Sequence, residues 1–547
     1  MPFQTSEKFP NIQEFNQSLP KNQRLPSRLS NRTKIFLKMI FWQFKRNWLV
    51  ILIWFLAFIL RILAAFFSKG YTHPDEHYQS IEIVYNEIFN YGLIPWEFID
   101  GARSWVFPFI VLTIFKIEMA FGVMNIEHLL IGVRLFTGII SMISVVVAYF
   151  FAKKIFGEKV ALFATGFIAF WYDFIFWSTR TMTDGLAMNF TFLATYLIYN
   201  CCNSVNQDSL AKRNSKIERN PNAILGKNTK KGLWESSLAG FFIGFSYMLK
   251  FPVAIIAIPI VLWLLYHKRW FYILTFSGTA VLMVLLQGVI DLFTWGSFLH
   301  SSLVFIDYNI ISGQSAHHGA SPFYAYIALI ASRFMAYTPF FLLFILLGIQ
   351  KNKKNVYLLG TALFFLIVFS FISHKEYRFV FPVIPYLVMI AANGAVKFPK
   401  FIKKEQLQKG VYVGLIVITL TCSAVTGIYT KNFQPQKSYC DAYMWVGEQN
   451  DFERVFIVDY TPYATPGFAY LQKNINYTWA PGYLLVDRFY QHSSERIYFI
   501  VPKDYMQIYS EINNTFSTYG ISLVKVFKTN ATDNDPLIFV YYHFPNN

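Results

Sequence analysis

The sequence "WLVILIWFLAFILRILAAFF" (residues 48–67) is followed almost at once by "GYTHPDEHYQS" (residues 70–80). The first stretch is apolar over about 20 residues, the length an α-helix needs to cross the hydrocarbon core of a membrane. The second places two adjacent carboxylates, Asp75 and Glu76, just after His73. A membrane span that ends in paired acids predicts a functional polar site at one surface of the membrane.

The composition indicates an integral membrane protein. Of the 547 residues, 55% are hydrophobic and 14% are charged, against about 25% charged residues in soluble domains. The net charge is +17, but basic loops beside membrane spans set topology, so we expect no nucleic-acid partner. The four cysteines do not have the spacing of a metal site or a disulfide framework. We therefore expect neither a metal nor another cofactor.

Apolar segments recur along the chain, and lysine and arginine orient them. Because cytoplasmic loops carry the excess of basic residues, the pattern predicts about eleven spans with every lysine-rich loop on the cytoplasmic side. The expected spans are Trp48–Phe67, Leu129–Phe151, Phe156–Trp177, Gly185–Cys202, Leu238–Leu249, Pro252–Leu265, Trp270–Phe293, Phe323–Ile349, Tyr357–Ser373, Phe379–Val396 and Gly410–Ile428. The apolar segment Trp105–Val123 is interpreted as a helix lying at the membrane interface, because a span there would put the basic "AKKIFGEK" (152–159) outside.

Three parts of the chain follow from this pattern. Residues 1–47 form a basic cytoplasmic tail, residues 48–428 a transmembrane catalytic domain, and residues 429–547 a small α/β domain on the outer side. The last part alternates four strand-like runs, "RVFIVDY", "ERIYFIVP", "ISLVKVF" and "LIFVYYHF", with a helical stretch near 504–518. It also holds sequons at Asn476, Asn513 and Asn530, which fits an outer location.

Ionisable residues of several loops gather on the predicted outer face. Taken singly, each can be a helix cap or a charge that reaches water, but their convergence favours a site. The candidates, in chain order, are His73, Asp75, Glu76, Arg103, Arg180, Lys250, His317, His318, His374, Lys375, Glu376 and Arg378.

These residue types fit the transfer of a sugar from a lipid-linked donor. A carboxylate can take the proton of an acceptor hydroxyl as a general base, and Asp75 is the first choice, with Glu76 second. Arginine, lysine and histidine can hold the donor phosphate and stabilise the charge that develops on it. We expect Arg378 to grip that phosphate and Glu376 to orient Lys375 or Arg378.

Four ordered blocks resemble glycosyltransferase family 22, the dolichyl-phosphate-mannose-dependent α-mannosyltransferases. They are "HPDEHYQSIEIVYNEIFNYGLIPWEF" with "ARSWVFP", "STRTMTDGLAM", "GVIDLFTWGSFLHSSLVFIDYNI" with "HGASPFYAY", and "SHKEYRFVFPVIPYL". The resemblance covers roughly residues 45 to 430 and is closest to the glycosylphosphatidylinositol branch.

The resemblance implies a GT-C membrane fold and inversion at the anomeric carbon. It implies dolichyl-phosphate mannose as donor, a membrane glycolipid as acceptor (a glycosylphosphatidylinositol precursor or a lipid-linked oligosaccharide) and no obligatory metal. Asp75 and Glu76 match the paired acids of the family, and its other recurrent positions match Arg103, His374, Lys375, Glu376 and Arg378. An endoplasmic-reticulum membrane with a lumenal site is implied, or a plasma membrane with an external site in a prokaryote.

Two positions depart from the family pattern. Lys250 stands in "LKFP" where an Arg-Pro pair is usual, and Asp184 follows "RTMT" where a short polar residue such as Asn is usual. The alternatives are a polytopic transporter or flippase, or a GT-C transferase of another sugar. A transporter would need ionisable groups deep inside its spans. Here the acids lie at span ends with few in span centres, and Arg61 and Arg134 are the exceptions that lie inside spans.

Overall fold

The computed structural model describes residues 31–214, 227–349, 353–430, 433–459, 461–528 and 537–545. Two compact units are distinguished, residues 1–56 and residues 57–547. The first contains the beginning of helix α2 (Asn31–Phe67), which has a non-helical backbone at Asn47 (φ −113°, ψ 16°). Residues 1–30 of the predicted basic tail lie outside the described residues.

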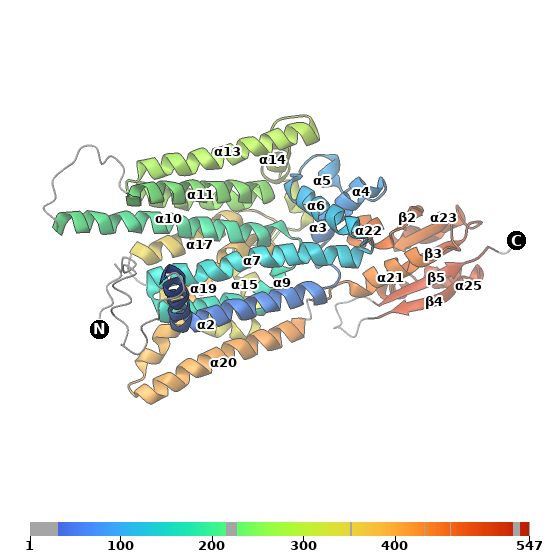
Figure 1. The fold of residues 1–547 in the computed structure, drawn as a ribbon. Coiled ribbons are helices and arrows are strands. Elements are labelled where there is room, and N and C mark those ends of the chain that lie inside the picture. The colour runs from blue at the N-terminus through green and yellow to red at the C-terminus, as the bar shows by residue number, and fades with distance from the viewer. Residues whose placement is uncertain are drawn as a thin grey trace. The chain divides into compact units, whose positions relative to one another are not determined.

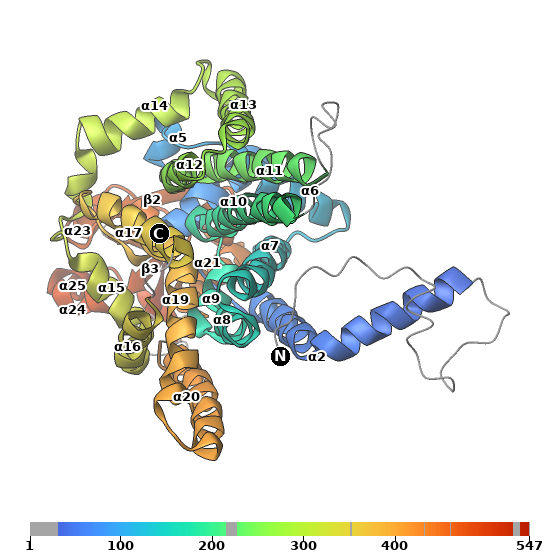
Figure 2. The same ribbon diagram turned by 90° about the vertical axis from the view of Figure 1, so that its left-hand side faces the viewer.

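Long helices run side by side in the second unit, and a sheet lies beyond one end of them (Figure 1). In Figure 2 the same bundle is seen from its other end, with α19 at its centre. The bundle helices are α7 (Ile126–Phe156), α8 (Glu158–Phe170), α9 (Tyr172–Ser178), α10 (Thr183–Asn214), α11 (Lys227–Leu249), α12 (Ala257–Tyr266), α13 (Trp270–Trp295), α15 (Ala325–Phe334), α16 (Thr338–Gly348), α17 (Lys353–Ser370), α19 (Ile384–Lys397) and α20 (Glu405–Thr430).

All eleven segments expected to cross the membrane are helical, although some are broken. Among the described residues, six helical stretches are long and apolar enough to span by themselves, and α8 with α9 makes a seventh if that pair, bent by 56°, is one span. The other four expected spans lie in α10, in α11, in the shorter apolar stretch Phe251–Tyr266, and in α17. Helices packed inside a bundle can be less apolar because protein, rather than lipid, surrounds them.

The predicted turn at "LKFP" is present and determines where Lys250 lies. Helix α11 ends at Leu249 and a 3₁₀ helix, η3 (Phe251–Ile256), follows. Pro252 lacks a backbone N–H and cannot continue a helix interior, so Lys250 adopts an extended backbone (φ −154°). A Cβ on Gly240 would lie 2.0 Å from Phe276 O, and one on Gly244 2.4 Å from Met283 Cβ. These glycines let α11 and α13 pack closely and in parallel, so the chain must turn back between them.

Short helices form a layer at the end of the bundle nearer the sheet (Figure 1). Four of them belong to the first outer loop: α3 (Pro74–His77), the π-helix η2 (Tyr78–Glu82), α4 (Ile83–Phe89) and α5 (Trp96–Ile99). Helix α6 (Val106–Ala120) follows and has 15 residues, fewer than the roughly 20 needed to cross a membrane. Its place at the interface stays a prediction. The later loops at this end add α14 (His300–Ile306), η4 (Asp307–Ile311), η5 (Gln314–His318) and α18 (Tyr377–Val380). The 3₁₀ helices η6 (Met335–Tyr337) and η7 (Phe381–Val383) interrupt two expected spans, and η8 (Phe398–Phe401) follows α19.

The C-terminal segment folds as a mixed α/β sheet, as its alternating pattern predicted. Its strands are β1 (Arg454–Val458), β2 (Asn476–Ala480), β3 (Ile497–Pro502), β4 (Ser522–Phe527) and β5 (Ile538–His543), in the order β2-β1-β3-β5-β4. β1 is parallel to both β2 and β3, whereas β5 is antiparallel to its neighbours β3 and β4. Its helical elements are α21 (Lys437–Glu448), η9 (Pro462–Ala464), α22 (Gly467–Leu471), η10 (Gly482–Leu484), α23 (Leu485–Tyr490), α24 (Lys503–Ile508) and α25 (Ser510–Thr518).

Four of the five strands coincide with the predicted runs, and β2 was not foreseen. Of the predicted sequons, Asn476 and Asn513 are exposed, and Asn530 lies outside the described residues. The core of this domain is continuous with the first outer loop, because buried residues such as Tyr71 and Tyr85 belong to the same cluster as Tyr443 and Val455. We call α21 to β5 the C-terminal domain.

Candidate active site

The two adjacent acids point in different directions because they begin a helix. His73 is the N-cap of α3, and its Nδ1 accepts a hydrogen bond from the Asp75 N–H at 3.1 Å. Pro74 stands at the first helical position, where a missing N–H costs nothing. Consecutive residues of a helix lie about 100° apart around its axis. Asp75 therefore borders a cavity, whereas Glu76 is buried with 4% of its surface exposed.

Glu76 serves the interior of the fold. Its Oε2 accepts a hydrogen bond from the Thr72 N–H at 2.8 Å, and its Oε1 lies 3.5 Å from Arg180 Nη1. Arg180 also donates to the carbonyls of Gly70 (3.1 Å) and Phe433 (3.2 Å). Glu76 and Arg180 thus bind backbone groups of residues 70, 72 and 433. Neither side chain borders the cavity that Asp75 faces.

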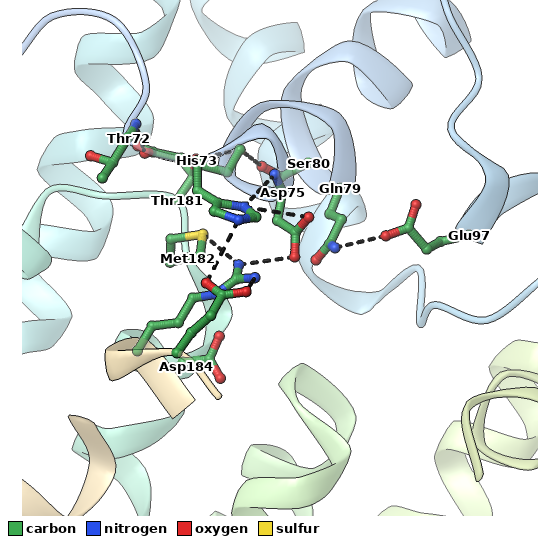
Figure 3. Close-up of polar contacts among 12 residues, drawn as sticks. Thr72, His73, Asp75, Gln79, Ser80, Glu97, Thr181, Met182 and Asp184 are labelled. Carbon is green, nitrogen blue, oxygen red and sulfur yellow. Dashed lines mark hydrogen bonds and ion pairs between the residues drawn. The ribbon is translucent and has the colours of Figure 1, made fainter. Parts of the chain in front are cut away.

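Asp75 is part of a cluster of alternating charges. Its Oδ2 lies 2.9 Å from Arg378 Nη1, and its Oδ1 lies 3.5 Å from His73 Nδ1. Glu376 binds the same guanidinium with both oxygens, each at 2.7 Å. Glu376 also lies 2.8 Å from His374 Nε2 and 3.6 Å from His73 Nε2. Figure 3 shows His73, Asp75 and Met182 converging on this point, with Gln79 directed toward Glu97.

This arrangement keeps both carboxylates ionised. Burial opposes the charge on Asp75, but the Arg378 guanidinium, helped by His73 and Arg103, outweighs burial and holds the pKa of Asp75 well below its usual range. Burial likewise opposes the charge on Glu376, and Arg378, His73 and His374 together lower its pKa. Asp75 is therefore a carboxylate, ready to accept a proton, at neutral pH.

Two cavities meet at Asp75. The polar cavity, of about 290 Å³, is lined by His73, Asp75, Trp96, Glu97, Ala102, Arg103, Phe305, Tyr308, Asn309, His374, Glu376, Arg378 and Phe379. The apolar cavity, of about 320 Å³, shares Asp75, Arg103, Phe305, Asn309, His374 and Phe379 with it. The remaining lining of the apolar cavity is mostly aliphatic and aromatic, namely Asp184, Tyr247, Lys250, Phe251, Pro252, Ile255, Ile306, Ile310, Val368, Phe369 and Ile372.

The apolar cavity contains one buried ion pair. Lys250 Nζ lies 3.2 Å from Asp184 Oδ2, and both side chains are more than nine-tenths buried. These are the two positions at which the sequence departs from the pattern of the family it resembles. Their contact gives a physical reason for both departures, since either charge alone would be costly at this depth.

The other predicted residues divide between the cavities and the scaffold. Arg103 borders both cavities, with its Nη2 3.7 Å from Glu97 Oε1. Lys375 turns away and donates to the carbonyls of Ser321 (2.9 Å) and Ile372 (2.6 Å). His317 is exposed and borders neither cavity. The side chain of His318 lies outside what the structure describes.

Several lining residues were not predicted. Trp96, Phe305, Tyr308, Asn309 and Phe379 lie inside the sequence blocks that suggested the site, but nothing in their residue type marked them. Aromatic residues are so frequent in this chain, at 19%, that only the fold separates the lining rings from the others. No group of three or more His, Cys, Asp or Glu among the described residues is arranged to hold a metal ion.

The two buried arginines inside spans are structural. Arg61 donates to Ser141 Oγ at 2.8 Å and to the carbonyls of Ala169 and Ile168, each at 3.2 Å. Arg134 donates to the carbonyl of Ser68 at 2.6 Å. Each joins neighbouring segments through neutral acceptors, so the feature that pointed to a transporter has an explanation within the fold.

Comparison with known proteins relates this site to a family and a fold. The sequence model of the Alg9-like mannosyltransferase family matches residues 52–455. GPI mannosyltransferase 3 of Candida albicans is 28% identical over 356 residues, which cover 63% of this chain and 64% of that protein. Mannosyltransferase APTG1 of Arabidopsis thaliana is 28% identical over 59% of this chain and 55% of its own. GPI alpha-1,2-mannosyltransferase 3 of Homo sapiens is 26% identical over 60% and 55%. The chain thus spans between 55% and 64% of these relatives.

Solved structures share the fold at low sequence identity. ArnT from Cupriavidus metallidurans, bound to undecaprenyl phosphate, has a TM-score of 0.55 at 11% identity and covers 90% of this chain and 98% of its own. AglB from Archaeoglobus fulgidus, in complex with an inhibitory peptide and a dolichol-phosphate, has a TM-score of 0.51 at 12% identity over 91% and 74%. The likeness confirms the GT-C fold expected from the sequence.

Proposed function

The chain belongs to the Alg9-like mannosyltransferase family, and from that premise we propose that it moves mannose from dolichyl-phosphate mannose to a membrane glycolipid. The observation that carries the proposal is the position of Asp75. Its carboxylate is held ionised where a polar and an apolar cavity meet. A reaction between a lipid-linked donor and a hydroxyl acceptor requires a base at such a junction.

The apolar cavity is the proposed place of the donor lipid. Its aliphatic lining suits a polyprenyl chain, and Lys250, Arg103 and His374 supply cationic or hydrogen-bonding groups beside it. Two solved structures that share the fold support a lipid phosphate, because ArnT is bound to undecaprenyl phosphate and AglB to a dolichol-phosphate. Arg378, in contrast, already binds two carboxylates, so its proposed role is to hold Asp75 ionised.

The proposed reaction is a single displacement with inversion. Asp75 takes the proton from the acceptor hydroxyl, and the oxygen attacks C1 of the mannose. The bond between C1 and the phosphate oxygen breaks, and its electron pair leaves with dolichyl phosphate. The phosphate gains negative charge, which Arg103 and Lys250 stabilise in a partly dry cavity. The product is an α-mannoside on the acceptor.

The polar cavity is the proposed place of the acceptor sugar. Trp96 and Tyr308 face each other there with ring centroids 4.4 Å apart, and Glu97 and Asn309 offer polar groups beside them. A sugar ring can lie against an aromatic face while its hydroxyls bind neighbouring polar groups, the usual division of labour in a binding pocket. The names of the relatives favour a glycosylphosphatidylinositol precursor, and we propose a lumenal site in the endoplasmic-reticulum membrane.

The experiment is transfer of labelled mannose from dolichyl-phosphate mannose to extracted glycolipids by the purified full chain, followed by linkage mapping of the product. Dolichyl-phosphate glucose serves as the competing donor, because the GT-C fold also supports other sugars. The proposal expects labelled α-mannoside and little glucose transfer. Equal or preferential transfer of glucose would show that mannose is not the specific donor sugar. The absence of any transfer to glycolipid would overturn the proposal.

A further inference from the structure

Most of the C-terminal domain, from residue 456 onward, lies beyond the family match, yet it contacts the loop that carries Asp75. Hydrogen bonds between the two come from residues 462–469, between β1 and β2. They meet Tyr71, Tyr78 and Glu82 of the first outer loop.

Glu82 is the centre of this contact. It is a carboxylate with no exposed surface, and four donors surround it. Its Oε1 accepts from the N–H groups of Leu93 (3.0 Å) and Phe468 (2.9 Å). Its Oε2 accepts from the N–H of Ala469 at 2.8 Å and lies 3.2 Å from His77 Nε2. A carboxylate suits this place because it has only acceptor sites, whereas an amide would turn an NH₂ group toward other donors.

Two tyrosine hydroxyls fasten the same segment. Tyr78 donates to the carbonyl of Pro462 at 2.8 Å and lies 3.0 Å from that of Thr465. Tyr71 donates to the carbonyl of Ala464 at 2.7 Å. These two tyrosines flank α3, the short helix that carries Asp75, because Tyr71 precedes it and Tyr78 follows it directly.

The path from this contact to Asp75 is short and continuous. Glu82 is the last residue of η2, and η2 follows α3 without a break. π-helical turns interrupt regular helices and are frequent at functional sites. In the part of the chain that the structure describes, no residue of the C-terminal domain lines either cavity. The hydrogen bonds to Tyr71, Tyr78 and Glu82 therefore give this domain a path to Asp75 through the loop.

We propose that the C-terminal domain is a brace for catalysis, and that Glu82 is a positioning residue that fixes the Asp75 turn to residues 462–469. The proposal rests on the proposed function, since it assigns Asp75 the role of base. Loss of the brace lets α3 shift, so that Asp75 leaves both the acceptor hydroxyl and Arg378.

Two pairs of variants test the brace, each with a control matched in chemistry. Glu82→Gln removes the charge and two acceptor sites. Its control is Glu495→Gln, which makes the same change in a carboxylate that contacts His492 and Arg454 within the C-terminal domain. Gly467→Ala would bring a Cβ within 2.6 Å of Glu82 Oε2 at φ +66°. Its control is Gly520→Ala, at φ +63° with nothing within 4 Å.

The measurements use the full chain at equal membrane abundance, with melting temperature, kcat, donor KM and the pH profile as readouts. A displacement of about 1 Å can cost roughly 100-fold in rate, so we expect kcat to fall about 10- to 100-fold for Glu82→Gln and Gly467→Ala. We expect an unchanged donor KM and an acid limb moved to higher pH, because Asp75 leaves Arg378. A purely structural role would not move that limb. Both controls should stay within about twofold of the wild type.

Three outcomes would overturn the brace. One is a folded Glu82→Gln chain with wild-type kcat and pH profile. Another is an equal loss for Gly467→Ala and Gly520→Ala, which would reflect backbone strain alone. If Glu82→Gln does not accumulate, Tyr78→Phe takes its place as the test, because it removes only the hydroxyl that binds residues 462 and 465. Full activity of Tyr78→Phe would also refute the brace. Transfer by the wild type in the same assay distinguishes failure of the brace from failure of the proposed function, because a wild type that transfers no mannose would refute the proposed function itself.

Discussion

Replacing Arg378 by lysine tests how the Asp75 carboxylate is kept ionised. The guanidinium makes three contacts with two acids: Nη1 lies 2.9 Å from Asp75, and Nε and Nη2 each lie 2.7 Å from Glu376. A lysine keeps the charge and has three donors, but they sit on one nitrogen and do not form a planar fork. One nitrogen cannot take the places of Nε, Nη1 and Nη2 together, so we expect the single contact with Asp75 to weaken more than the paired contact with Glu376.

The size of the effect follows from the contact that is lost. A hydrogen bond to a charged group contributes about 1.5–3 kcal/mol, and about 1.4 kcal/mol corresponds to a factor of ten in rate. Arg378→Lys should therefore lower kcat about 10- to 100-fold at acidic pH, where the less supported Asp75 takes up a proton. Arg378→Ala should lower it further, because the two acids then repel each other without a counter-charge.

The pH dependence has a definite sign. In the wild type the pKa of Asp75 is depressed, so the active carboxylate persists on acidification and the acid limb lies below the usual carboxylate range. In Arg378→Lys the attraction weakens while burial, which raises this pKa, remains. The acid limb should move to higher pH, so that the relative loss of kcat is greatest in acid and shrinks as pH rises.

The assay is kcat against pH with dolichyl-phosphate mannose, at equal amounts of correctly inserted protein. Arg496→Lys is the control, since it makes the same change in an exposed pair with Glu453 in the C-terminal domain. A profile and kcat for Arg378→Lys that match those of Arg496→Lys would refute the reasoning and remove Arg378 from the site.

Three further predictions concern the donor, the acceptor and the topology. Lys250→Met should raise the donor KM about tenfold, because one charged hydrogen bond to the phosphate is lost. Adding Asp184→Asn should restore the melting temperature but leave the donor KM raised. An unchanged donor KM would place the phosphate elsewhere. Trp96→Ala should raise the acceptor KM about 5- to 10-fold at constant donor KM, and an effect on donor KM alone would contradict the assigned cavity. A cysteine at Asp100 should react only from the lumenal side and one at Lys404 only from the cytoplasmic side; labelling of both from one side would break the topology.

The sequence was sufficient to bring the main charges together. "HPDE" and "SHKEYR" each follow an apolar span, and the basic loops place both on one face. Their contact, Asp75 with Arg378 and Glu376 with His374, follows from that topology. The four predicted strand runs likewise needed only the alternation of apolar residues.

The direction of each side chain required the structure. Asp75 and Glu76 are equal candidates in sequence, and only the helix start at His73 sends the first to the cavity and the second to Arg180. The same holds for Lys375. Glu376 has an extended backbone (φ −130°), and side chains alternate in extended chain, so His374 and Glu376 face the site while Lys375 faces away.

Pairings between distant segments were also beyond the sequence. Lys250 and Asp184 were each visible as departures from a pattern, but nothing indicated that they touch. Glu82 lies inside the first of the sequence blocks that suggested the site, yet its four donors come from three segments that only folding brings together. Long-range partners of a single residue leave no periodic signal.

The most direct test of the account is the mannosyl transfer rate of Asp75→Asn. The change keeps the size of the side chain and removes the proton acceptor. With dolichyl-phosphate mannose and a glycolipid acceptor, we predict a fall in kcat of about 10²- to 10⁴-fold with unchanged donor KM and membrane abundance. A folded Asp75→Asn protein that transfers mannose within about twofold of the wild-type rate would contradict the assignment of Asp75 as the base.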